Sequence, residues 1–206
     1  MTAEIGQYAL ILALMVSAVG GVLTLAGAEL ASRSWMRVGM AAAAVLAVLA
    51  TIAIGALAWG FVESDFSILN VARNSNIALP WYYKLAAVWG SHEGSILFWV
   101  TTLAWWIFAV ALSARHLPER VLARILGTLF IITFGLYLFI LTTSNPFLRL
   151  FPPAEAGADL NPLLQDPGMW ALPFLLLLPL RHCWAAVWTS LGRGGCVRGQ
   201  RLHGCS

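Results

Sequence analysis

Residues 38–62 read VGMAAAAVLAVLATIAIGALAWGFV, a run of 25 residues without a charged side chain. A helix rises about 1.5 Å per residue, so about 20 apolar residues cross a hydrocarbon core of about 30 Å. Three other runs reach this length: Ile5–Ala28 with 24 residues, Gly94–Ala114 with 21 and Ile125–Leu148 with 24. Strands of a membrane barrel would instead alternate over about ten residues. The sequence therefore predicts an all-α, polytopic membrane bundle with four transmembrane helices, over about 5–28, 38–62, 94–114 and 125–148.

The composition excludes several classes of protein. Of 206 residues, 60% are hydrophobic and 10% are charged, whereas soluble domains have about 25% charged residues. The four runs contain no Asp, Glu, Lys, Arg or His, which disfavours a proton or ion pathway. Nucleotide-binding, serine-hydrolase and zinc-protease motifs are absent from the sequence, so no catalytic residue is assigned and no metal site is expected. The isoelectric point of about 9.0 gives no reason to expect a nucleic-acid partner.

Loop charges predict how the bundle is oriented. Residues 31–37 carry two Arg and no acid, and residues 115–124 carry three Arg against Glu119 alone. Residues 63–93 carry three acids and two bases, and residues 144–166 carry three acids and one base. Because Lys and Arg are enriched in cytoplasmic loops, the two short loops are predicted to be cytoplasmic. The N-terminus and both long loops would then lie on the outer side of the membrane.

A short aromatic segment stands out in the first long loop. Pro80 and the run Trp81–Tyr83 predict a helix that starts at Pro80, ends at Gly90 and lies in the membrane interface. Its aromatic side chains have two interpretations. They form either a belt at the membrane surface or a platform for a planar apolar ligand, with Lys84 beside it to meet carboxylates.

His92 is the other candidate in this loop, and it too has two interpretations. A histidine at a membrane boundary can ligate a metal or haem iron or carry a proton. Alternatively, His92 and Glu93 cap a helix that begins near Gly94, where a carboxylate favours the positive end of the helix dipole. The candidate ligand-binding residues from the sequence are Trp81, Tyr82, Trp89 and His92.

Four motifs in order carry a resemblance to a known family. They are NSNIALPWYYK at 74–84, WGSHEGSILFW at 89–99, SNPF at 144–147 and DLNPLLQDPG at 159–168. This pattern resembles the N-terminal part of the CcmF family, the haem lyase component of bacterial cytochrome c maturation. A related protein that serves cytochrome c nitrite reductase shares much of it. The resemblance covers about residues 1–168.

The resemblance implies a function that the composition does not. Such a protein lies in the bacterial inner membrane, with the outer side of the predicted bundle, including its N-terminus, in the periplasm. It accepts haem, its cofactor or cargo, from a periplasmic haem chaperone and helps to attach the haem to the Cys thiols of apocytochrome c. Its expected partners are that chaperone, other maturation subunits, apocytochrome c and membrane lipid. The alternative from the residues alone is a passive membrane subunit of a respiratory or ion-translocating complex, which would be expected to place ionisable residues within its spans.

The chain departs from the family pattern after Gly168. The His-Pro-Pro segment and Trp-rich loop that follow in the family are absent, and residues 171–206 contain four Arg, all three Cys and no acid. We therefore expect residues 1–168 to be the CcmF-like part and residues 169–206 to be an irregular, frameshifted or truncated tail. On this interpretation the chain alone is inactive as a haem lyase.

Overall fold

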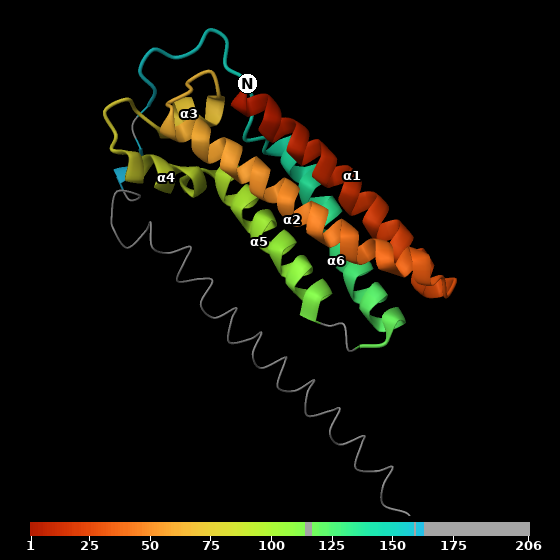
Figure 1. Ribbon diagram of the computed structural model, residues 1–206. Helices are drawn as coiled ribbons and strands as arrows, with labels where there is room; N and C mark the ends of the chain where they lie inside the picture. Colours follow the sequence, from red (N-terminus) through yellow and green to blue (C-terminus); the bar gives the residue numbers. More distant parts are fainter. Residues whose placement is uncertain (114–116, 159, 163–206) are drawn as a thin grey trace, which may run out of the picture. The chain divides into compact units, whose positions relative to one another are not determined.

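Four long helices form the structure, a computed structural model that describes residues 1–113, 117–158 and 160–162 (Figure 1). They are α1 (Thr2–Glu29), α2 (Arg33–Val62), α5 (His92–Ser113) and α6 (Glu119–Thr143). Each is long and apolar enough to cross a membrane, so the prediction of four transmembrane helices is confirmed. Two short helices, α3 (Leu69–Asn74) and α4 (Trp81–Gly90), lie between α2 and α5. The predicted tail lies outside the described residues.

The bounds of α2 and α6 differ from those of the uncharged runs, at the N-terminal end of both helices and at the C-terminal end of α6. α2 begins five residues earlier than its uncharged run, at Arg33, and α6 begins six residues earlier, at Glu119. Charged residues can occupy the first turn of a helix because their long side chains carry the charged groups out to water. α6 ends at Thr143, whereas the uncharged run continues to residue 148. The reason is Pro146, since the residue before a proline is disfavoured in helical geometry. The fourth span is therefore shorter than predicted at its C-terminal end.

Small residues allow the helices to approach closely. α1 packs against α2 and α6, and α5 packs against α2, α6 and α4. A Cβ atom added at Gly20 of α1 would lie 3.1 Å from the Cβ of Ala42 in α2, and one added at Gly127 of α6 would lie 2.5 Å from Cγ of Leu25. Close packing of this kind drives helix association in lipid, where no hydrophobic force joins helices.

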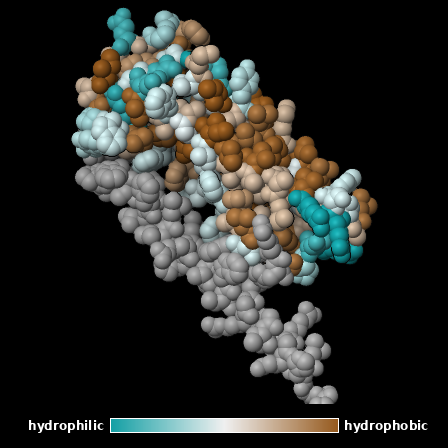
Figure 2. All heavy atoms as spheres, in the orientation of Figure 1, coloured by the Kyte–Doolittle hydropathy of each residue, from teal (hydrophilic) through white to brown (hydrophobic). Residues whose placement is uncertain are grey.

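The buried serine and threonine hydroxyl groups of the described spans donate to carbonyl groups of their own helices, whereas the buried hydroxyl of Tyr137 in α6 has no hydrogen-bond partner among the described residues. Thr133 donates to the carbonyl of Leu129 at 2.7 Å, and Ser17 donates to that of Leu14 at 2.8 Å. Polar atoms at membrane depth need such partners because no water is there to supply them. Figure 2 shows the result on the surface: apolar side chains cover the helices, and hydrophilic side chains gather at the two ends.

The antiparallel order of the helices gives the bundle two different ends. One end, which we call the loop end, carries the start of α1 and residues 63–91, 144–158 and 160–161 (Figure 1). The opposite end, the arginine end, carries the turn at residues 30–32 and the start of α6, with Arg33, Arg37, Arg120 and Arg124. All the candidate site residues therefore fall at the loop end.

Candidate functional site at the loop end

The two long loops are joined to each other at the loop end. Residues 67–69 and 148–150 form a short antiparallel bridge with two backbone N–H···O=C bonds of 2.8 Å. Further along, the N–H of Ala158 donates to the carbonyl of Ala72 in α3 at 2.7 Å. The loop that follows α6 therefore packs on the loop that follows α2, and together they form a base at the loop end, while α4 packs against α2 and α5.

Arg149 holds this base to the first helix. Its guanidinium donates to the carboxylate of Glu4 in α1 and to the hydroxyl of Ser67, and lies 3.8 Å from Oδ2 of Asp65. The Arg149 side chain is 27% exposed, so these charge-assisted bonds are partly shielded from water. The guanidinium of Arg149 thus joins the loop after α6 to α1 and to the loop after α2, and its charge is paired within the protein.

α4 has one buried face and one exposed face. Its buried residues are Lys84, Ala86, Ala87 and Val88, and Nζ of Lys84 donates to Oγ of Ser64 at 2.6 Å. The expectation that Lys84 stands beside an aromatic platform is therefore wrong. The hydroxyl of Ser64, two residues after the end of α2, accepts this hydrogen bond, and the contact directs the Lys84 side chain into the protein.

The exposed face of α4 carries aromatic rings. Trp81 is 65% exposed and Tyr82 is 49% exposed, and their ring centroids lie 5.9 Å apart in an edge-to-face arrangement. Tyr83 is tilted against Tyr82 at 4.6 Å. Trp89, at the other end of α4, is half-buried and lies 6.3 Å from the ring of Phe98 in α5. The structure thus brings Trp81 and Tyr82 together and pairs Trp89 with a residue that the sequence analysis did not select.

The junction between α4 and α5 is a single residue, Ser91. Its hydroxyl accepts the N–H of Gly94 at 3.0 Å, which is the geometry of an N-cap. The expected cap by His92 and Glu93 is therefore wrong, because α5 already begins at His92 and Ser91 fills the cap position. His92 is exposed, so its imidazole faces outward at the start of α5.

Among the described residues of the loop end, Arg73 is the exposed cationic side chain that forms no ion pair. Lys84 is buried against Ser64 and Arg149 is held by Glu4 and Asp65, while Arg73 at the end of α3 is exposed and forms no ion pair within the described residues. No cluster of three or more His, Cys, Asp or Glu side chains occurs in the described part of the chain. The site is thus an aromatic surface at the loop end of the bundle, with the exposed imidazole of His92 and a guanidinium, that of Arg73, which has no ion pair among the described residues.

These features define a class of protein: a multi-pass helical membrane protein with an aromatic and histidine-bearing surface at one end of its bundle. A family model described as cytochrome c assembly protein matches residues 89–191, half of the chain. The chain therefore belongs to the cytochrome c assembly protein family. The match continues past Gly168 to residue 191. That residues 169–206 are a frameshifted or truncated tail stays a prediction.

Individual relatives point to the same family. The chain is 48% identical to the cytochrome c-type biogenesis protein CcmF of Pseudomonas aeruginosa over 86% of this chain and 27% of that protein. It is 47% identical to CcmF of Haemophilus influenzae over 86% of this chain and 28% of the relative. A solved structure of the cytochrome c haem lyase CcmF superposes with a TM-score of 0.68 and 27% identity, covering 71% of this chain and 25% of that one.

These findings confirm the resemblance seen in the motifs and favour cytochrome c biogenesis over a passive subunit of a respiratory complex. The chain spans about a quarter of the length of the relatives it matches.

Proposed function

We propose that the chain forms the N-terminal membrane part of a haem-handling protein of cytochrome c maturation, and that the exposed face of α4 with His92 receives haem on the periplasmic side. The observation that carries the proposal is the exposure of Trp81 and Tyr82 on a helix whose opposite face is buried. Large aromatic rings held outward on a fixed base present a flat apolar surface, which suits a flat macrocycle.

Haem is a substrate here, and the described residues fit part of its chemistry. The rings of Trp81 and Tyr82 offer stacking or edge contacts to the porphyrin, and the exposed imidazole of His92 offers one axial ligand to iron. Arg73, which is exposed and forms no ion pair among the described residues, is the group best suited to meet a propionate. A second axial ligand would come from the longer relative or from a partner.

Attachment of haem to apocytochrome c belongs, on this proposal, to the longer protein. Relatives are about four times as long as the matched region, and on this proposal the matched region supplies one wall of the site. A haem chaperone that delivers the macrocycle and an apocytochrome that presents its thiols are the partners this surface requires. Both would approach the loop end from the periplasm.

The proposed orientation is tested with reporter fusions. A reporter active only in the periplasm, fused after Ser75 or Gly157, is expected to give a strong signal because both positions lie at the loop end. The same reporter fused after Trp35 or Pro118, at the arginine end, should give none. A reversed pattern would place the aromatic surface in the cytoplasm and remove the proposed meeting with apocytochrome.

The haem surface is tested in a complete relative that carries this N-terminal part. Trp81→Leu removes one ring and is expected to lower haem retention about fivefold, since an aromatic contact contributes about 1 kcal/mol beyond its buried area. His92→Ala should change the absorption spectrum of bound haem as well as the yield of holo-cytochrome c, because it removes an iron ligand. The measurements are haem co-purification, its spectrum and the amount of cytochrome bearing covalent haem.

The matched control for the ring is Trp59→Leu. Trp59 is 55% exposed in the last turn of α2 near the same end of the bundle, but it lies outside α4. Trp59→Leu is expected to leave haem retention unchanged. Equal losses in the Trp59 and Trp81 variants would mean that both residues belong to a membrane belt and that α4 is not a haem surface.

A further inference from the structure

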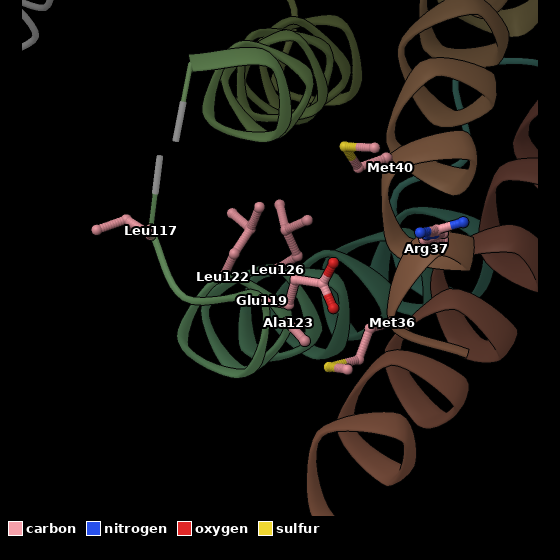
Figure 3. Close-up of a pocket in the computed structure, with 8 residues that line it drawn as sticks. All are labelled: Met36, Arg37, Met40, Leu117, Glu119, Leu122, Ala123 and Leu126. Atoms are coloured by element: carbon pink, nitrogen blue, oxygen red, sulfur yellow. The ribbon is translucent and has the colours of Figure 1, made fainter. Parts of the chain in front are cut away.

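A groove opens between α2 and α6 at the arginine end, the end of the bundle opposite the aromatic surface (Figure 3). It has a volume of about 250 Å³. Two of its lining residues, Met36 and Ala123, belong to a buried cluster with Ala28, where α1, α2 and α6 meet. Its apolar walls are completed by Met40, Leu117, Leu122 and Leu126.

The size and position of the groove limit what it can hold. Pockets for whole small molecules are usually about 300–1,000 Å³, so this groove suits part of a longer apolar ligand. It opens beside the charged first turns of α2 and α6, which mark the level of lipid headgroups at the end of a span. An acyl chain of a lipid is the apolar ligand present at that level.

Charge at the mouth of the groove is positive. Among the described residues of the arginine end, four arginines stand against two glutamates, Glu29 and Glu119. Glu119, whose carboxylate Figure 3 shows between Met36 and the leucines of α6, lies 3.6 Å from Nε of Arg33. Glu29 is paired with Arg124 at 3.0 Å.

Two arginines are left without an acidic partner among the described residues, Arg37 and Arg120. Arg37 borders the groove and Arg120 does not, although both are exposed. The apolar wall therefore ends at an uncompensated guanidinium on α2. A guanidinium matches the oxygens of a phosphate better than a point charge does.

We propose that this groove binds one anionic phospholipid, with an acyl chain between Met40 and Leu126 and its phosphate at Arg37. The net positive charge of the arginine end selects a lipid with net negative charge over one whose ammonium group cancels its phosphate. Basic pockets between transmembrane helices hold lipid headgroups on the same principle. The groove is thus a lipid site that is separate from the haem surface and independent of it.

The experiment is native mass spectrometry of the full chain purified in detergent, with phosphatidylglycerol added. The wild-type chain is expected to retain one phosphatidylglycerol molecule and to retain phosphatidylcholine with the same acyl chains at least fivefold less. Arg37→Gln should weaken phosphatidylglycerol retention about fivefold, the effect of one basic side chain near a membrane surface. Met40→Trp fills the groove and should abolish retention.

Two matched controls separate this site from general effects. Arg120→Gln removes the same charge at the same end without touching the groove, and Val48→Trp adds the same ring on the exposed side of α2. Both should bind phosphatidylglycerol like wild type, with unchanged helix content by circular dichroism. The proposal is overturned if phosphatidylcholine binds equally well, if Arg120→Gln matches Arg37→Gln, or if Met40→Trp retains the lipid.

Discussion

Gly94→Ala is expected to destabilise the protein by about 3 kcal/mol, the upper end of the usual cost of overpacking. Helix propensity alone predicts the opposite sign, because alanine is favoured over glycine in a helix by about 1 kcal/mol. The reason is the turn between α4 and α5. A Cβ atom at position 94 would lie 1.7 Å from the carbonyl oxygen of Val88 and 2.9 Å from Oγ of Ser91.

The contact with Val88 cannot be relieved by rotating a side chain, since the atom in the way belongs to the backbone. Either α4 moves away from α5, or α5 begins later and loses the Ser91 cap. Both responses change the junction between α5 and α4, the helix that carries the aromatic surface. In a complete relative, Gly94→Ala is therefore expected to lower holo-cytochrome c yield along with stability.

Thermal unfolding of the chain in detergent measures the stability effect, and Gly55→Ala is the matched control. A Cβ atom at Gly55 in α2 would meet nothing within 4 Å. The melting temperature of Gly55→Ala should equal or exceed that of wild type, and that of Gly94→Ala should fall by about 6–12 °C, at about 2–4 °C per kcal/mol for this chain length. Gly94→Ala melting at or above wild type would show that the turn tolerates a side chain.

The spans and α4 could be predicted from the sequence because their signals are local. A run length sets a transmembrane helix, and Pro80 and Gly90 mark the two ends of α4. The cap of α5 was misassigned because Ser91, His92 and Glu93 are consecutive polar residues, and a shift of one or two positions decides which of them caps. Helix ends are the least certain part of any prediction from sequence.

The arrangement of the site depended on contacts between distant residues, which a single sequence does not reveal. Lys84 is turned inward by Ser64, 20 residues earlier, and Arg149 meets Glu4, 145 residues away. Trp89 is a candidate from the sequence, but its neighbour Phe98 lies on the next helix and carries no signal in the sequence that would pair the two rings. The residues of the surface could thus be chosen from their types and spacing, whereas the face on which each lies could not.

Gly157→Ala is expected to release the loop after α6 from the loop after α2. Gly157 has φ of +71°. A non-glycine residue there costs about 1 kcal/mol or more. A Cβ atom would also lie 2.3 Å from the carbonyl oxygen of Ser75.

Opening this loop frees Arg149 from its partners, so trypsin cleavage after Arg149 reports the change. If the combined cost is about 2 kcal/mol, the open population and the cleavage rate rise about thirtyfold, because cleavage of a rapidly opening segment follows its opening equilibrium. Gly135→Ala in α6, where a Cβ atom would meet nothing within 4 Å, should be cleaved like wild type. Gly157→Asn separates the two causes, since asparagine tolerates positive φ but still brings a Cβ atom to Ser75. Cleavage of Gly157→Asn as fast as that of Gly157→Ala would assign the effect to the close approach of the two loops, while wild-type rates for both variants would show that the loops are not held together at this glycine.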